Sequence, residues 1–242
     1  MTRNMVAYWT AKEGTARSDW EDGAAYSPGS GWFAVTDGAS TGSDSRSWAY
    51  ALARAVLTDR PAGIYDDGAG LVDWVRQVRA GFDPAAPEFP PSRAPGWVRA
   101  ASAVRGAHAT LLAGRLVGDT VDAVAVGDTC LFHCGADRVE VFPAMAAGDF
   151  GSAPALVPSQ VRAEDRGLRQ AVRRFRTRVT PGDAIFVATD ALAEWLVRNR
   201  TDDGVWRLLR RIGHTGFEAL CADLRARGQA KNDDMTLFRA LV

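Results

Sequence analysis

The N-terminal third of the chain combines short apolar runs with amphipathic stretches. Strand-like apolar runs occupy Met5–Thr10 and Gly31–Thr36, and we expect both to be strands of one sheet. Ser43–Leu57 instead places large apolar residues four apart, a spacing that lines one face of a helix. A second helix is predicted at Leu71–Ala80. The proline-rich segment Asp83–Pro95 must be a loop, because proline lacks an amide hydrogen and fixes its own backbone angle.

In the rest of the chain, strand-like and helix-like hydrophobic patterns alternate several times. In order, the pattern predicts a helix from about Gly96, an antiparallel meander over Ala109–Phe142 with a hairpin turn at Gly127–Asp128, a surface loop at Pro143–Gln160, strands at Arg173–Val179 and Ala184–Thr189, helices at Ala191–Arg198, Gly204–Ile212 and Phe217–Arg227, and a final strand at Met235–Val242. This order lacks the regular strand–helix alternation of a doubly wound parallel sheet. We therefore expect an α+β fold of antiparallel sheets covered by helices, in one domain spanning residues 1–242.

Composition narrows the class of protein. Hydrophobic residues make up 47% of the 242 residues and charged residues 24%, which is enough apolar material for a sizeable core. Basic and acidic side chains are equal in number, so no overall field would attract nucleic acid or an anionic membrane. We find no leader-like segment and no apolar run of about 18 residues or more. We expect a cytoplasmic monomer whose cysteines are reduced.

Carboxylates stand where the predicted strands begin or end. Asp37 and Asp190 each follow an apolar run, Asp233 precedes the last one, and Glu21-Asp22 lies upstream of the second strand. A carboxylate at a strand end is held by the sheet yet faces solvent, so several such ends can converge on one point. Taken singly, each has an ordinary explanation as a turn, a helix cap or surface charge. Their order along the chain carries the functional hypothesis.

Five motifs, in order, resemble the PPM (PP2C-type) family of protein phosphatases in its bacterial form. They are Arg17-Ser-Asp-Trp-Glu-Asp22, Val35-Thr-Asp-Gly38, Val124-Ala-Val-Gly-Asp-Thr129, Val187-Ala-Thr-Asp-Ala-Leu192 and Asn232-Asp-Asp-Met-Thr236. The resemblance runs from about Tyr8 to Val242. It implies a four-layer αββα sandwich, in which helices flank two antiparallel β-sheets, with two Mn²⁺ or Mg²⁺ ions at one end.

The resemblance also implies a role for each matched residue. Asp37 would bridge the two metal ions, the Gly38 carbonyl would bind one of them, Asp190 and Asp233 would hold the other, Glu21 would reach the Gly38-side metal directly or through water, Asp22 would orient a metal-bound water, and Arg17 would grip the substrate phosphate. The implied reaction is hydrolysis of phosphoserine and phosphothreonine esters on protein partners by a metal-bridged hydroxide. A serine/threonine kinase would be the natural counterpart of such an enzyme.

Elementary chemistry supports this set of residues. Clustered carboxylates repel one another, and divalent cations remove that penalty. Ligands that are all oxygen suit hard Mg²⁺ or Mn²⁺ rather than Zn²⁺. Two such ions roughly 3.5–4 Å apart can activate a shared water for in-line attack on phosphorus. The planar guanidinium of Arg17 matches two phosphate oxygens.

Two departures from the family pattern keep other hypotheses open. Ala39 stands where many relatives have a histidine, so a histidine acid is missing there. The element around the family's third metal is matched only loosely by Gly106–Thr110, with Arg105 near the usual acidic position. A PP2C-like pseudophosphatase, which binds a phosphoprotein or a regulatory partner without turnover, is therefore the alternative. A phosphatase of small phosphate esters is a third hypothesis.

Overall fold

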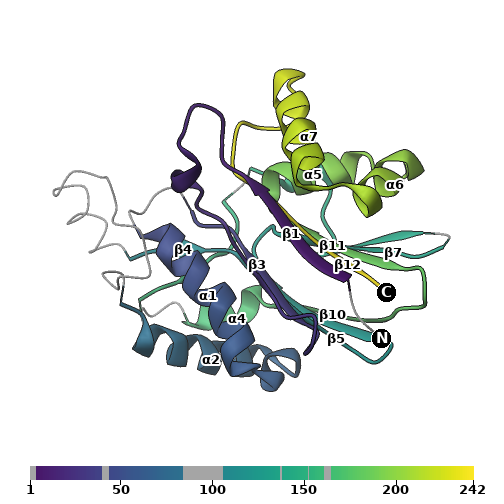
Figure 1. The fold of residues 1–242 in the computed structure, drawn as a ribbon. Helices are drawn as coiled ribbons and strands as arrows, with labels where there is room; N and C mark the ends of the chain where they lie inside the picture. The colour runs from purple at the N-terminus through teal and green to yellow at the C-terminus, as the bar shows by residue number, and fades with distance from the viewer. Residues whose placement is uncertain (1–3, 40–43, 84–105, 137, 152, 161–164) are drawn as a thin grey trace.

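Two antiparallel sheets of five strands each form the centre of the molecule, as a computed structural model of the chain shows (Figure 1). The structure describes residues 4–39, 44–83, 106–136, 138–151, 153–160 and 165–242. The predicted helix from about Gly96 and the proline-rich segment from Pro84 lie outside the described residues.

Each sheet draws its strands from distant parts of the sequence. Sheet A contains, in spatial order, β1 (Asn4–Thr10), β12 (Met235–Leu241), β11 (Ala184–Ala188), β7 (Cys130–Cys134) and β8 (Val139–Phe142). Sheet B contains β10 (Arg173–Arg178), β6 (Thr120–Val126), β5 (Leu111–Val117), β3 (Trp32–Thr36) and β2 (Gly23–Tyr26). The short strands β4 (His108–Ala109) and β9 (Val157–Pro158) form a third pair. β1 forms one edge of sheet A and pairs with β12, so the first and last strands of the chain lie side by side.

Helices cover the outer face of each sheet, which gives four layers (Figure 1). On sheet B lie α1 (Ser45–Asp59), α2 (Gly68–Gly81) and α4 (Asp165–Ala171), and on sheet A lie α5 (Asp190–Arg198), α6 (Asp203–Arg211) and α7 (His214–Ala226). Among the described residues, no helix is long and apolar enough to cross a membrane. The expected α+β sandwich of two antiparallel sheets flanked by helices is confirmed.

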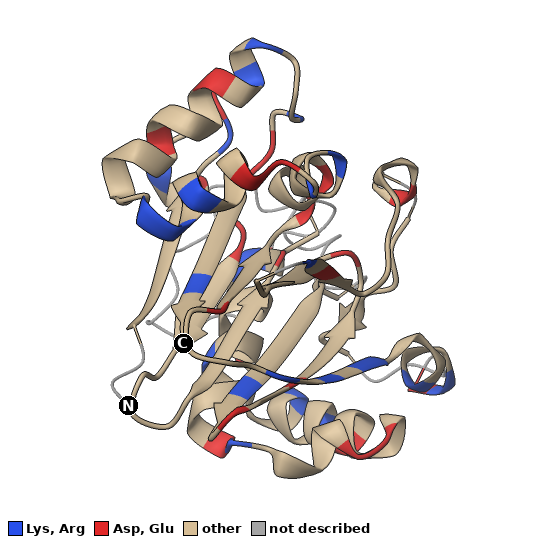
Figure 2. Ribbon diagram, turned by 90° about the vertical axis from the view of Figure 1, so that its right-hand side faces the viewer, with Lys and Arg blue, Asp and Glu red and all other residues tan. Residues whose placement is uncertain are grey.

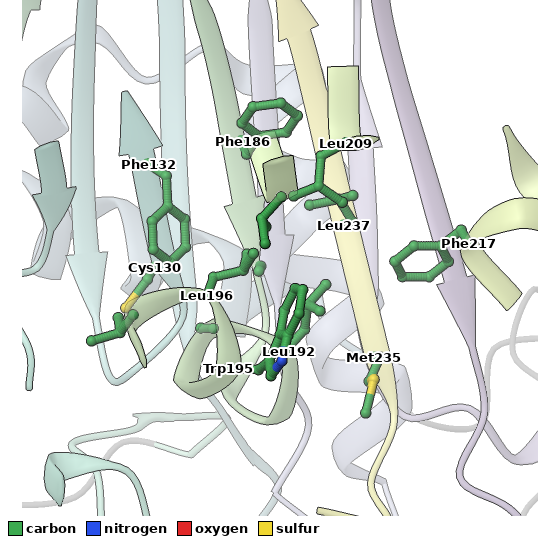
Figure 3. Packing of buried hydrophobic residues seen from close by; sticks show 14 of the residues in the cluster. Cys130, Phe132, Phe186, Leu192, Trp195, Leu196, Leu209, Phe217, Met235 and Leu237 are labelled. Atoms are coloured by element: carbon green, nitrogen blue, oxygen red, sulfur yellow. The ribbon is translucent and has the colours of Figure 1, made fainter. Parts of the chain in front are cut away.

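Three apolar clusters hold the layers together. Phe33 and Phe238 stack with ring centroids 4.7 Å apart in the cluster between the two sheets. Figure 3 shows the cluster under the sheet A helices, where Phe132 and Phe186 face residues of α5 and α6. Trp48 of α1 is fully buried in the third cluster, on sheet B, as its helical spacing predicts. The central strands β3, β7 and β11 are buried along their whole length, and their sequences are therefore nearly continuous apolar runs.

Continuous burial also explains where the sequence prediction of the sheets was wrong. β1 and β3, expected in one sheet, lie in different sheets. The segment expected as one meander divides into a β5–β6 hairpin in sheet B and a β7–β8 hairpin in sheet A. Gly127–Asp128 is therefore a crossing between the sheets and not a hairpin turn. A strand buried on both faces has no alternating pattern that could show which sheet it joins.

Candidate metal centre

The loops that carry the predicted acidic residues meet at one end of both sheets. In sheet A, Ala188 at the end of β11 lies between Cys130 at the start of β7 and Leu237 near the start of β12. In sheet B, Gly23 at the start of β2 pairs with Thr36 at the end of β3. The antiparallel pairing thus brings the loops near Glu21 and near Asp234, from opposite ends of the chain, to the same end of the two sheets.

Hydrogen bonds and a close backbone contact fix the loop after β3. The Asp37 amide donates to Thr110 Oγ1 at 3.0 Å, and the Asp37 carbonyl accepts from the Thr110 amide at 2.8 Å. A Cβ added at Gly38 would lie 2.6 Å from the Glu21 carbonyl oxygen, closer than such atoms can approach. Glycine is therefore required at this position, because the Glu21 backbone packs directly against it.

The carboxylates at this end of the sheets act on one another electrostatically. Burial raises the pKa of Asp37 well above its ordinary value, and the charges of Asp22, Asp190, Asp128 and Asp233 raise it further. Burial likewise raises the pKa of Asp190 to about 6, with contributions from Asp128 and Asp233. We call these five residues the acidic cluster. Four were predicted as site residues from the sequence, and the structure brings them together.

Asp22 is the most deeply buried member of the acidic cluster. Its Oδ2 accepts hydrogen bonds from Thr189 Oγ1 at 3.1 Å and from Thr236 Oγ1 at 2.7 Å, and Thr236 Oγ1 in turn accepts from Trp20 Nε1 at 3.1 Å. Its Oδ1 is buried and has no hydrogen-bond partner among the residues that the structure describes. Burial raises the pKa of Asp22 well above its ordinary value, and the charge of Asp234 adds to this, whereas the two threonine hydroxyls oppose it. Trp20, Thr189 and Thr236 thus fix the orientation of the Asp22 carboxylate.

Replacing Thr236 by Val is expected to lower the free energy of unfolding by about 1–3 kcal/mol. The variant leaves the Trp20 N–H without its acceptor and removes one of the two donors to Asp22. Thr236→Ser keeps the hydroxyl and should stay close to wild type. Urea denaturation of the three proteins measures the difference, and equal stability of the Val and wild-type proteins would contradict this network.

Asp128 is the member of the cluster that sequence reasoning missed. Only 6% of its surface is exposed, and burial raises its pKa while the charge of Lys231 lowers it. Gly127 before it has φ +104°, and an added Cβ would lie 2.7 Å from Thr110 Cγ2. Reading Gly-Asp as a hairpin turn hid this residue. The rule that located Asp37 and Asp190, a carboxylate at the end of an apolar strand, also fits Asp128, which lies two residues after the end of β6.

Asp234 was also missed, and its role is to join loops. Its Oδ1 accepts from the Lys12 amide at 2.8 Å and its Oδ2 from the Glu21 amide at 2.6 Å. Burial raises the pKa of Asp234, and these two backbone hydrogen bonds oppose the rise. Asp233 next to it keeps its place in the acidic cluster because Asp234 ties the loop before β12 to the loop after β1.

Glu21 and Arg17 occupy the rim of the site. Glu21 Oε2 lies 3.2 Å from Lys12 Nζ. Arg17 Nη2 lies 2.8 Å from His214 Nε2 and 3.7 Å from Glu218 Oε1, so the guanidinium is turned toward α7. Its central carbon also lies 4.7 Å from the centroid of the Trp9 ring. The role of Arg17 at a substrate phosphate therefore stays a prediction.

The acidic cluster has the chemistry of a site for hard divalent cations. Its side-chain donors are all carboxylate oxygens, and the partnerless, buried Asp22 Oδ1 is the kind of atom that a cation satisfies. In the part of the chain that the structure describes, no group of three or more His, Cys, Asp or Glu side chains is arranged to hold a metal ion as it stands. Mutual repulsion of uncompensated carboxylates favours such a spread arrangement.

Solved structures show which class of fold this is. The sandwich is that of the PP2C-type bacterial serine/threonine phosphatases, several of which align over almost the whole chain. The Mycobacterium tuberculosis serine/threonine phosphatase PstP/Ppp superposes with a TM-score of 0.66 at 14% identity, covering 100% of this chain and 99% of that one. PppA, a key regulatory component of T6SS in Pseudomonas aeruginosa, gives 0.62 at 16% identity, covering 100% and 98%.

A further solved structure bears on the metal site. The PstP catalytic domain in complex with two manganese ions superposes with a TM-score of 0.62 at 14% identity, covering 98% of this chain and 97% of that one. No family model matches the sequence, and no curated protein does. At this level of identity, the comparisons establish the fold.

Proposed function

We propose that this protein is a metal-dependent phosphatase that hydrolyses phosphoserine and phosphothreonine esters on protein partners, and that residues 1–242 act as one phosphatase domain. The observation that carries the proposal is the acidic cluster, in which five buried or partly buried carboxylates come from five separate segments of the chain. A bound cation would offset the electrostatic cost of placing them together. The manganese ions in the PstP complex support the same reading.

Each residue has a proposed task at this centre. Two Mn²⁺ or Mg²⁺ ions, when bound, supply charge neutralisation for the phosphate and acidify water that attacks it. Asp37 lies among all the other carboxylates and is the proposed bridging ligand, with the Gly38 carbonyl beside it. Asp190 and Asp233 flank it as further ligands. Asp22, held by Thr189 and Thr236, would use its second oxygen to orient a metal-bound water.

A pocket lined by three basic and two acidic side chains lies beside the acidic cluster and supports a place for the substrate phosphate. It has a volume of about 570 Å³ and lies between the loop after β1 and α7, with Lys12, Arg17 and Arg225 among its lining residues. Arg225 Nη2 donates to the Asp233 carbonyl at 2.7 Å, which places a guanidinium next to a proposed metal ligand. Arg17 is exposed and can leave His214 and Glu218 by side-chain rotation to meet a phosphate in this pocket.

The test of the proposal is hydrolysis of a phosphothreonine peptide and of p-nitrophenyl phosphate by the purified chain. We expect turnover with Mn²⁺ or Mg²⁺, none in EDTA, and recovery when metal is restored. A panel of phosphorylated metabolites run beside the peptide distinguishes a protein phosphatase from a phosphatase of small esters. A metal-loaded protein that hydrolyses neither the peptide nor the aryl phosphate would refute enzymatic activity.

Binding of a phosphoprotein without turnover is the second candidate function, and the position of Arg17 favours it. The guanidinium proposed to grip phosphate is engaged by α7, and Ala39 supplies no acid for the leaving group. Calorimetry with Mn²⁺ addresses this candidate: weak or absent binding favours a pseudophosphatase. Metal binding without hydrolysis favours it equally.

A further inference from the structure

A second, positively charged site lies at the opposite end of sheet A from the acidic cluster. There, a groove of about 770 Å³ is lined by the end of β7, the turn before β11, the segment before α6, and one face of α6. Asp128 precedes β7 and Gly135 follows it, so the strand separates the two sites by roughly 20 Å at about 3.3 Å per residue. A ligand in this groove would not touch the acidic cluster.

Four arginines line this groove, which we call the arginine groove: Arg138, Arg200, Arg207 and Arg210. Arg210 is fixed, since its guanidinium donates to the Gly182 carbonyl at 2.7 Å and to the Cys134 carbonyl at 2.9 Å. The other three side chains are exposed and make no ion pair with any residue that the structure describes. Their guanidinium groups are therefore accessible to an anion in solvent.

The acidic residues of the arginine groove do not cancel this charge. Asp183 and Asp203 are the carboxylates in its lining, two against four arginines. Asp183 is already engaged, because Oδ2 accepts from the Thr180 amide at 2.9 Å and lies 2.9 Å from His133 Nε2. Figure 2 shows basic and acidic residues interspersed over the helices. A second excess of arginines lines a pocket at β10, but there Arg115 and Arg176 both pair with Asp122. The arginine groove is thus a local excess of positive charge on a chain with zero net charge.

The chemistry of the lining selects among anions. Guanidinium groups bind phosphate oxygens in pairs, more strongly than they bind neutral acceptors. Trp206 is buried with its ring against Phe132 and Phe186, so this tryptophan offers no platform on which a nucleic-acid base could stack. The groove is also concave, which suits a chain segment better than a membrane surface.

We propose that the arginine groove binds a phosphorylated segment of a partner protein, at a docking site separate from the acidic cluster. Its arginines receive the phosphate. Binding here needs no divalent cation and no turnover. The groove therefore holds a phosphoprotein whether the acidic cluster hydrolyses an ester elsewhere on that protein or not.

The test is fluorescence anisotropy with a labelled phosphothreonine peptide and the full chain in EDTA, where the proposed enzyme does not turn over. The Arg138→Ala/Arg207→Ala variant is expected to weaken binding by at least about tenfold, because two charge-assisted contacts are lost. The matched control is Arg166→Ala/Arg178→Ala, which removes two exposed arginines on the sheet B side of the molecule. It should bind like wild type. Melting temperatures confirm that both variants fold.

Several results would overturn docking at this site. Equal affinity of the groove variant and wild type would place the phosphopeptide elsewhere. Equal affinity of the unphosphorylated peptide would remove the role of phosphate. Displacement of the peptide by inorganic phosphate or by a single-stranded oligonucleotide at the same concentration would mean a general anion site. Because no metal is present, none of these outcomes depends on whether the acidic cluster is catalytic.

Discussion

Replacing Asp37 by Asn is expected to lower kcat/KM for Mn²⁺-dependent hydrolysis of a phosphothreonine peptide by at least about a hundredfold. Asp37 is the residue whose pKa is raised by every other member of the acidic cluster, so its carboxylate lies at the centre of the set. The amide that replaces it has the same shape but no charge and binds a divalent cation poorly. Steady-state kinetics at saturating Mn²⁺ measure the loss.

The matched control removes one carboxylate outside the site. Asp223→Asn on α7 makes the same chemical change at an exposed position, where the carboxylate pairs with Arg227 at 2.8 Å. We expect its kcat/KM to remain within about twofold of wild type, because exposed ion pairs contribute little. Retention of more than about a tenth of the activity by the Asp37 variant would show that the cluster does not form the catalytic centre.

The sequence identified most of the acidic cluster because strand ends are local features. Asp37 and Asp190 each follow an apolar run, and Asp233 precedes one, so a single rule locates all three. Convergence of those strand ends depends on sheet order, which the sequence left open. It followed instead from the family resemblance, and the antiparallel pairing of β11 with β12 places the strand ends beside Asp190 and Asp233 next to each other.

What the sequence could not predict depends on contacts between distant segments. Asp234 was given no role from the sequence, yet it is buried, and its carboxylate accepts hydrogen bonds from backbone amides more than 200 positions away. Arg17 matches the family motif, but its neighbour is His214 of α7, which no local pattern connects to it. The short strand β2 and the helix α4 were missed because neither has enough residues for a clear period.

The same pKa shifts make the acidic cluster costly to the metal-free fold. In the folded chain, the pKa of Asp190 is raised to about 6, and those of Asp22 and Asp37 are raised well above the ordinary value of 3.8. Folding therefore favours the protonated carboxyls. This stabilisation is fully present below pH 3.8 and is lost as the pH rises through the folded-state pKa values, so it is absent at high pH. Bound divalent cations would reverse the sign by favouring the charged carboxylates.

In EDTA at pH 8, the Asp37→Asn variant is therefore expected to be more stable than wild type, by on the order of 1–3 kcal/mol, or several degrees in Tm. The amide removes the charge on which the other carboxylates act and has no proton to lose between pH 4 and 8. Saturating Mn²⁺ should invert the order, raising the wild-type Tm well above that of the variant, since only the intact cluster binds the cation tightly. The measurement is thermal unfolding of both proteins at pH 5 and pH 8, each with EDTA or with Mn²⁺. Asp223→Asn again serves as the control. A variant less stable than wild type in EDTA would contradict this account, and so would a wild-type Tm that Mn²⁺ does not raise. Repulsion between the carboxylates must lower the stability of the metal-free protein, and a bound cation that relieves it must raise that stability.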